Sequence, residues 1–255
     1  MNRYPDNELS FSDLLKRSIR LHYLTLKHTI FFILVITLIK YLSVLALALT
    51  PMPAHKAVYI IAALIISYFF AAALVAAQRA FLDQSGSMLN ALKTIWHRIL
   101  PIYGTLLIYV IGTIILYYLI DSVTFAVDKL LHEPSSSSLH GGSLILMTAL
   151  MFMYIAMFYF AFPITIIDEK PVHKAFYDST LMTEKNKFGV LILFLILCST
   201  IVLLIPGAIH EYFLTLYHLD AVFDFIVLCV AGPIYINLLL LLINDSKKQM
   251  QYIDL

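Results

Sequence analysis

Six long apolar runs constrain the fold of this chain more than any other feature. Each run has the roughly 20 residues that an α-helix needs to cross a hydrocarbon core about 30 Å thick. The runs cover residues 29–50, 57–80, 101–120, 143–167, 188–206 and 221–243. Polar and apolar residues do not alternate along them, which favours helices over the strands of a membrane barrel. The sequence therefore predicts six transmembrane helices.

The composition agrees with a membrane protein and excludes several other classes. Apolar residues make up 61% of the 255 residues and charged residues 13%, whereas soluble domains have about 45–50% and about 25%. Such a chain cannot be a disordered segment, a secreted disulfide scaffold, a collagen or a nucleic-acid binder with a basic face. We expect an all-α integral membrane protein in which residues 1–255 form a single polytopic domain.

The scarce cations indicate the orientation of the spans. Fourteen of the 17 lysines and arginines lie in the N-terminal arm, the second and fourth connections and the C-terminal tail. The other connections hold only Lys56 and Lys129, and Lys40 falls within the first span. Because positive charge near a span end resists translocation, both termini are predicted to be cytoplasmic, with three short loops outside.

Three of the polar segments on the predicted cytoplasmic side have the pattern of amphipathic helices, at residues 9–28, 86–100 and 171–187. In the first, one helical stripe is apolar and consists of Phe11, Leu15, Ile19, His22 and Leu26. A second stripe is polar and consists of Asp13, Lys16, Arg17 and Arg20. In the second segment, Lys93 and Arg98 lie on the polar side and Trp96 is placed as an interfacial anchor. Amphipathic basic helices beside a span are expected to lie in the headgroup plane.

These segments divide the chain into three similar units, at about 9–80, 86–167 and 171–243. Each unit consists of an interfacial helix followed by a transmembrane hairpin. Leu15, Leu92 and Phe176 correspond in this alignment. The threefold repeat is a hypothesis that rests on topology.

Two segments resemble a known family. The first is Phe162-Pro163-Ile-Thr-Ile-Ile-Asp168-Glu169-Lys170-Pro171 with Ala175 to Ser179, Leu181, Thr183 and Asn186, and the second is Gly232-Pro233 with Asn244-Asp245. They resemble the YciC-like bacterial inner-membrane proteins, which are similar to the membrane domain of some glycerophosphoryl diester phosphodiesterases. The resemblance implies six helices in a bacterial inner (plasma) membrane and does not imply an activity. The sequence shows no counterpart of the catalytic barrel of those phosphodiesterases.

Lys40 is a candidate for an intramembrane functional group. A charge near the middle of a span costs at least about 2.5–3.5 kcal/mol on insertion scales. Lys40 could face the bundle as part of a substrate or proton site, with Asp224 of the sixth span as its acidic partner. Alternatively, its long side chain snorkels to the outer interface.

The Gly232-Pro233 pair in the sixth span is a second candidate, because proline frees backbone carbonyls inside the membrane. Tyr235 and Asn237 follow this break. Transporters use broken helices with nearby polar groups to bind solutes, although a proline in a span is more often a kink that neighbouring groups satisfy.

Motifs for catalysis, cofactors and metals are absent. The sequence has no G-x-S-x-G, P-loop or G-x-G-x-x-G motif. Five histidines lie on the predicted outer side without a recognised metal-ligand spacing; they are His55, His132, His140, His210 and His218. We therefore assign no catalytic, cofactor or metal residue.

Two functions remain open. The first is a non-enzymatic membrane protein that organises the bilayer or a membrane complex through anionic headgroups of the cytoplasmic leaflet. Its candidate headgroup ligands are Lys16, Arg17, Arg20, Lys93 and Arg98. A membrane-protein partner or a homo-oligomer fits the same pattern, and nucleic acid is not an expected partner. The alternative is a small-solute transporter or its membrane subunit, with Lys40, Asp224, Tyr235 and Asn237 as candidate residues.

Overall fold

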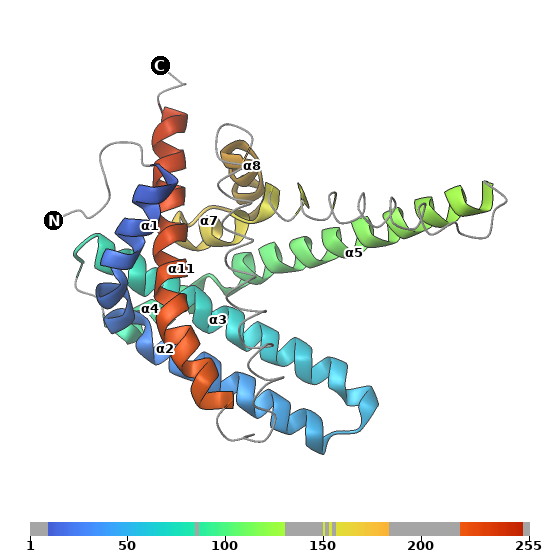
Figure 1. Ribbon diagram of the computed structural model, residues 1–255, viewed down its shortest axis with the longest axis horizontal. Helices are drawn as coiled ribbons and strands as arrows, with labels where there is room; N and C mark the ends of the chain where they lie inside the picture. Colours follow the sequence, from blue (N-terminus) through green and yellow to red (C-terminus); the bar gives the residue numbers. More distant parts are fainter. Residues whose placement is uncertain are drawn as a thin grey trace. The chain divides into compact units, whose positions relative to one another are not determined.

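The computed structural model describes residues 10–84, 87–130, 150, 153–154, 157–183 and 220–251. Eight α-helices and one short 3-10 helix form the regular structure of this part (Figure 1). The α-helices are α1 (Phe11–Arg20), α2 (His22–Leu49), α3 (His55–Phe81), α4 (Met88–His97), α5 (Ile99–Leu130), α7 (Ala161–Ile167), α8 (Val172–Met182) and α11 (Asp220–Gln251). The prediction of an all-helical chain is confirmed for the described residues.

Four of these helices are long and apolar enough to cross a membrane, which indicates a multi-pass membrane protein. The segments are His22–Leu47, Met52–Phe81, Ile99–Leu116 and Phe225–Asp245. They overlap the predicted spans 29–50, 57–80, 101–120 and 221–243. The predicted span 188–206 and part of 143–167 lie outside the described residues.

The helices are longer than the apolar runs, because polar residues such as lysine and glutamine also have favourable helix propensity. Helix α2 begins at His22, well before the run at 29–50, and α11 continues to Gln251. Residues 9–28 consequently do not form one interfacial helix. The chain bends at Leu21, whose N–H bonds back to the carbonyl of Arg17 at 3.0 Å.

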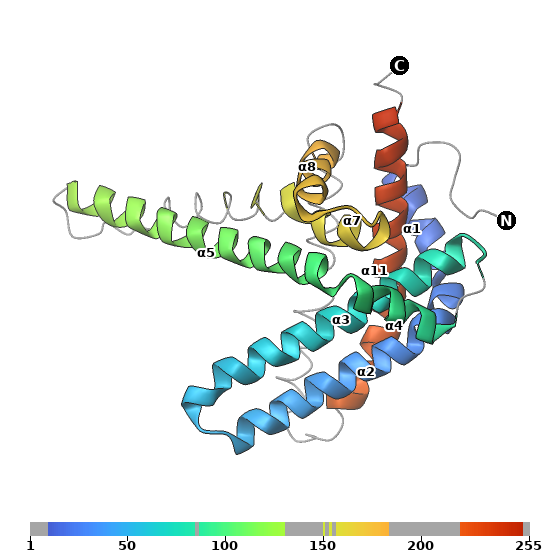
Figure 2. The ribbon, with the colours of Figure 1, turned by 180° about the vertical axis from the view of Figure 1, so that it is seen from behind.

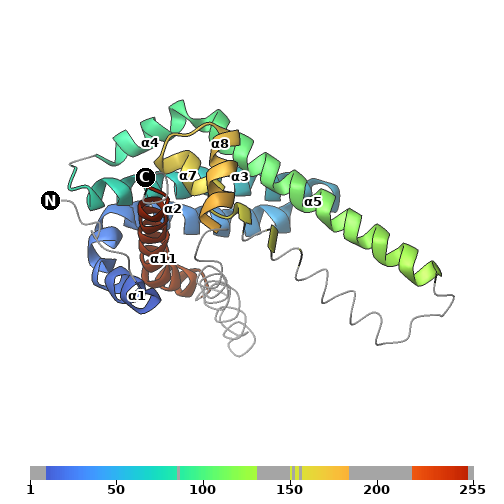
Figure 3. The ribbon, with the colours of Figure 1, turned by 90° about the horizontal axis from the view of Figure 1, so that it is seen from above.

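The chain forms two compact units, and the single domain over 1–255 stays a prediction. The first unit comprises residues 1–99, 166–169 and 189–255. In it, α2 and α3 form a hairpin joined by Pro51 and the 3-10 helix Met52–Ala54, and α11 packs against α2 (Figures 1 and 2). Helix α1 packs against α11 (Figure 3), and α4 packs against α3. The core of this unit includes Leu14, Phe32, Leu74, Phe81, Ile95 and Leu241.

The second unit comprises residues 100–165 and 170–188. Here α5 pairs with the described part of the predicted fourth span. The hydroxyls of Thr105 and Thr165 lie 3.0 Å apart, and the Tyr154 hydroxyl donates to the carbonyl of Tyr109 at 3.2 Å. Helix α8 joins this pair through Ser179, which donates to the carbonyl of Met157 at 2.7 Å.

Helices α1, α4 and α8 share one register. Aligning them on Leu15, Leu92 and Phe176 also aligns their first residues, which are Phe11, Met88 and Val172. The buried positions coincide too: Leu14, Ala91 and Ala175 in one turn, and Ser18, Ile95 and Ser179 in the next. Ser10 and Ser87 cap α1 and α4 in the same way, accepting from the N–H groups of Asp13 and Asn90.

The apolar stripe predicted for α1 is not its buried face. Leu14 and Ser18 face inward, whereas Ile19, which belongs to the predicted stripe, is 53% exposed. The reason is that α11 offers both an apolar surface and hydrogen-bonding groups, so α1 turns a serine toward it rather than its most apolar line. Hydropathy alone cannot reveal this orientation.

Candidate functional site

The outward side of α1 combines cations with large apolar side chains. Lys16 and Arg20 are exposed, as are Ile19 and Tyr23, the latter 78% exposed. Within α1, residues three and four apart lie on one side of the helix, so Lys16, Ile19 and Arg20 point away from the buried Leu14 and Ser18. We call these three residues, together with Tyr23 at the start of α2, the α1 face.

Helix α4 has a matching outward side. Lys93 and His97 are exposed, and Trp96 between them is 64% exposed. Leu89, one turn earlier, is 73% exposed. We call these four residues the α4 face. Both faces thus carry a lysine, a large apolar residue three positions on and a nitrogen-bearing side chain four positions on.

The five candidate headgroup ligands differ in their availability. Lys16, Arg20 and Lys93 are exposed, and Arg17 is half-buried. The side chain of Arg98 is only 17% exposed, and its Nη1 lies 4.0 Å from a carboxylate oxygen of Glu169. Arg98 is therefore directed into the first unit, which the sequence pattern did not reveal.

Asn237 of α11, an intramembrane candidate, lies at the centre of a polar cluster that joins α11 to α1 and α2. It is fully buried. Its Oδ1 accepts from the Thr25 hydroxyl, and its Nδ2 donates to the carbonyl of Ser18 at 2.9 Å. The Ser18 hydroxyl in turn donates to the carbonyl of Ile234 at 2.7 Å. With His22, we call Ser18, Thr25 and Asn237 the polar cluster.

The break at Pro233 is repaired by a residue from α2. Proline has no N–H, so the carbonyl four residues earlier, that of Cys229, lacks its normal helical donor. The Nε2 atom of His22 lies 3.1 Å from this carbonyl oxygen. Since a carbonyl only accepts, His22 donates and replaces the missing bond. Helix α11 runs through Pro233 without ending there. Sequence reasoning identified the freed carbonyl but not its donor, which lies 207 positions away.

The remaining intramembrane candidates are not brought together by the described residues. The ring of Tyr235 packs against that of Phe70, with centroids 6.0 Å apart. Lys40 is exposed on α2. Asp224 falls in α11, but its side chain lies outside the described part, so its pairing with Lys40 stays a prediction.

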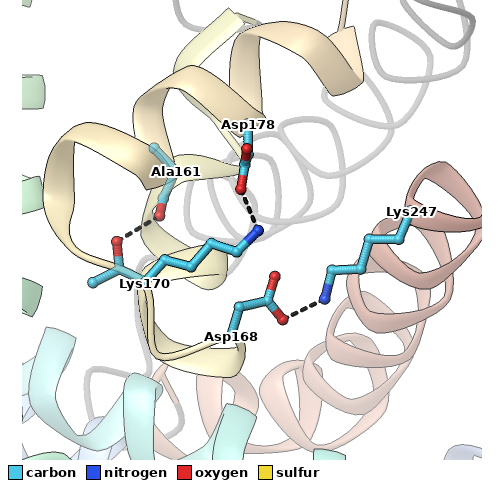
Figure 4. A network of polar contacts seen from close by, with 6 residues as sticks. Ala161, Asp168, Lys170, Asp178 and Lys247 are labelled. Atoms are coloured by element: carbon cyan, nitrogen blue, oxygen red, sulfur yellow. Dashed lines mark hydrogen bonds and ion pairs between the residues drawn. The ribbon is translucent and has the colours of Figure 1, made fainter. Parts of the chain in front are cut away.

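Two ion pairs flank the connection between α7 and α8 (Figure 4), and the sequence pattern indicated neither of them. In the first unit, Lys247 pairs with Asp168, whose side chain is 13% exposed. In the second unit, Lys170 pairs with Asp178. The first pair joins residues 79 positions apart, which no local pattern can reveal.

On the α1 face and the α4 face, cations lie beside large apolar side chains. Among the described residues, no group of three or more His, Cys, Asp or Glu side chains is placed to hold a metal ion. His55 bonds through Nε2 to the carbonyl of Thr50 at 3.0 Å, and the other four predicted outer histidines lie outside the described residues. No protein-family model, curated protein or solved structure matches the chain.

Proposed function

We propose that this chain is a non-enzymatic protein of the bacterial inner membrane that organises the bilayer, or a complex within it, by binding anionic lipid headgroups. In this proposal it has six spans, both termini are cytoplasmic, and the YciC-like proteins are its relatives. The observation that carries the proposal is the pair of outward faces on α1 and α4, where cations alternate with exposed apolar side chains.

Such faces suit the boundary between water and lipid. Exposed Ile19, Tyr23, Leu89 and Trp96 gain by entering the acyl boundary, where aromatic rings also anchor helices. The neighbouring cations are attracted to an anionic leaflet by about 1 kcal/mol each. A water-exposed surface would leave the same apolar groups unburied.

The exposed side of α2 supports the placement of the α1 face at this boundary. Lys27 is its last exposed cation before an apolar stretch that begins at Ile30 and continues to Leu49, interrupted by Lys40. At 1.5 Å per residue this stretch is about 30 Å long, the thickness of a hydrocarbon core. The α1 face precedes it directly.

The hydrogen bonds of the polar cluster favour this function over transport. The Asn237 amide and the Cys229 carbonyl, which a solute could have used, are bonded to α1 and α2. Exposed Lys40 within the apolar stretch is the observation that favours a transporter. Under that alternative, Lys40→Ala and Asp224→Ala abolish the uptake or export of a solute without unfolding the protein.

The protein contains one tryptophan, Trp96, which makes the proposal testable by fluorescence. The full chain is reconstituted in phosphatidylcholine vesicles that contain a minor share of brominated lipid, either phosphatidylglycerol or phosphatidylcholine. We expect brominated phosphatidylglycerol to quench Trp96 more strongly at equal mole fraction, because the exposed Lys93 beside Trp96 enriches anionic lipid. High salt should reduce the difference.

The variant Lys93→Gln should lower the preference for phosphatidylglycerol by about fivefold, as expected for one cation at about 1 kcal/mol. Lys56→Gln is the matched control. Lys56 is also an exposed lysine, but it lies at the start of α3, whereas α4 with Lys93 follows the end of α3. Equal quenching by the two brominated lipids in the unmodified protein would contradict the proposal.

A further inference from the structure

The shared register of α1, α4 and α8 allows their outward residues to be compared position by position. Lys16 corresponds to Lys93 and Tyr177, Ile19 to Trp96 and Thr180, and Arg20 to His97 and Leu181. The comparison is meaningful because the buried positions of the three helices also coincide. Residues at equivalent outward positions of the three helices therefore have the same orientation relative to the buried side of their helix.

From this recurrence we infer that the α1 face and the α4 face are two copies of one site, each of which binds a single anionic phospholipid. The inference rests on the proposed function and deepens it by naming a discrete ligand and its stoichiometry. A general attraction to an anionic leaflet would need cations but no fixed arrangement of them.

A pair of nitrogen-bearing side chains in each site, one of them a lysine, is placed to hold a phosphate. Side chains four residues apart on a helix are neighbours, with Cβ atoms about 5–6 Å apart. Lys16 and Arg20 form this pair on α1, and Lys93 and His97 form it on α4. Arginine adds a bidentate fork for phosphate oxygens, and lysine adds a point charge.

The apolar residues of each site commit it to a lipid rather than to free phosphate. Ile19 on α1, Tyr23 at the start of α2, and Leu89 and Trp96 on α4 present large exposed apolar surfaces beside the lysines. An acyl chain or glycerol backbone would cover them, whereas inorganic phosphate would leave them in water.

Helix α8 has the register but not the residues of the site. Tyr177, which is 65% exposed, stands where the other two helices have lysine, and Leu181 stands where they have Arg20 and His97. The structure therefore predicts two bound phospholipids for each chain rather than three.

Native mass spectrometry of the full chain tests this number. The protein is reconstituted with phosphatidylglycerol, transferred to mild detergent, and washed until bulk lipid is removed. We expect two retained phosphatidylglycerol molecules per chain. Lys16→Gln with Arg20→Gln should remove one, Lys93→Gln with His97→Gln should remove the other, and the two pairs combined should remove both.

Tyr177→Gln is the matched control, because it changes an exposed residue at the same register on α8 and should leave the count at two. Unchanged far-UV circular dichroism and melting temperature of each variant show that it is folded. Inorganic phosphate at matched ionic strength should not displace the lipids, and displacement by phosphate would overturn the assignment to a phospholipid.

The outcomes separate this inference from the proposed function. Preferential quenching of Trp96 by phosphatidylglycerol, together with a retained count that the two variant pairs do not change, would overturn the discrete sites and leave the proposed function standing. Loss of the quenching preference in the unmodified protein would overturn both.

Discussion

At the scale of single residues, a span of this protein tolerates a buried amide and a proline because other helices satisfy the groups that they introduce. Asn237 bonds to Thr25 and to the backbone of Ser18, and His22 donates to the carbonyl that Pro233 leaves without a donor. In a membrane the alternative to each bond is an unsatisfied polar group in an apolar medium. These contacts therefore specify how α11 meets α1 and α2.

Asn237→Ala should destabilise the protein by about 1–2 kcal/mol, because it leaves the Thr25 hydroxyl and the Ser18 carbonyl without their bonds to Asn237. The free energy of unfolding is measured by titrating SDS into the protein in mild detergent. Ser67→Ala is the control, since the Ser67 hydroxyl is exposed and bonds only locally to the carbonyl of Ala63. A loss no larger than that of the control would show that the amide bonds are not structural.

The contribution of His22 should depend on Pro233. In the unmodified protein, His22→Ala removes the donor to the Cys229 carbonyl and should cost about 1 kcal/mol. In a Pro233→Ala background the helix supplies its own N–H, so the same substitution should cost much less. A double-mutant cycle on the unfolding free energy measures this coupling. Additive effects of the two substitutions would be inconsistent with the repair of the break by His22.

At the scale of helices, glycines set how closely α5 approaches its neighbour. A Cβ added at Gly112 would overlap the Tyr154 hydroxyl and would lie 2.8 Å from its Cζ atom. A Cβ added at Gly104 would make an ordinary contact of 3.4 Å with Val172. Helix α5 therefore has room for a larger side chain at Gly104 but not at Gly112.

Gly112→Ala should destabilise the second unit by about 1–3 kcal/mol through overpacking, despite the better helix propensity of alanine. Gly104→Ala should be neutral or slightly stabilising. Thermal unfolding followed by circular dichroism in detergent compares the two variants. Equal effects would mean that the Tyr154 ring does not restrict the approach to α5.

The sequence predicts the existence of these helices better than their ends or their orientation. Long apolar runs identify α2, α3, α5 and α11, because lipid exposure demands a continuous apolar stretch. The polar His22 at the start of α2 has no such signal, so the sequence pattern assigns it to the interfacial segment 9–28 rather than to the span. The buried side of α1 depends on hydrogen bonds to a helix more than 200 positions away, which periodicity cannot contain.

At the scale of the whole chain, the first unit is built from both ends of the sequence. Helix α1 near the N-terminus packs against α11 near the C-terminus. The headgroup candidates could be named from their charge, but the inward direction of Arg98 and the contacts of Asn237 required the distant segments to be present. Sequence patterns reflect neighbours along the chain, whereas the contacts of Arg98 and Asn237 join residues far apart in the sequence.

Reporter fusions should place Ser137 and the C-terminus on opposite sides of the membrane. The prediction follows from the distribution of lysine and arginine, which places residue 137 in an outer connection and the tail inside. A fusion after Gln84, in the second connection, should match the C-terminal reporter. Activity at Gln84 of a reporter that works only outside the cytoplasm would show that the orientation is the reverse of the predicted one.

The contact between Ser18 and Ile234 has a consequence for the time course of synthesis. These residues lie 216 positions apart. At about 5–20 residues per second, roughly 10 to 40 s pass between their emergence from the ribosome. Helix α4 follows its partner α3 directly and can dock as soon as it is made, whereas α1 cannot make its contacts with α11 until α11 is synthesised. The first amphipathic helix to be translated is therefore the last to dock, and completion of the first unit is timed by the arrival of α11.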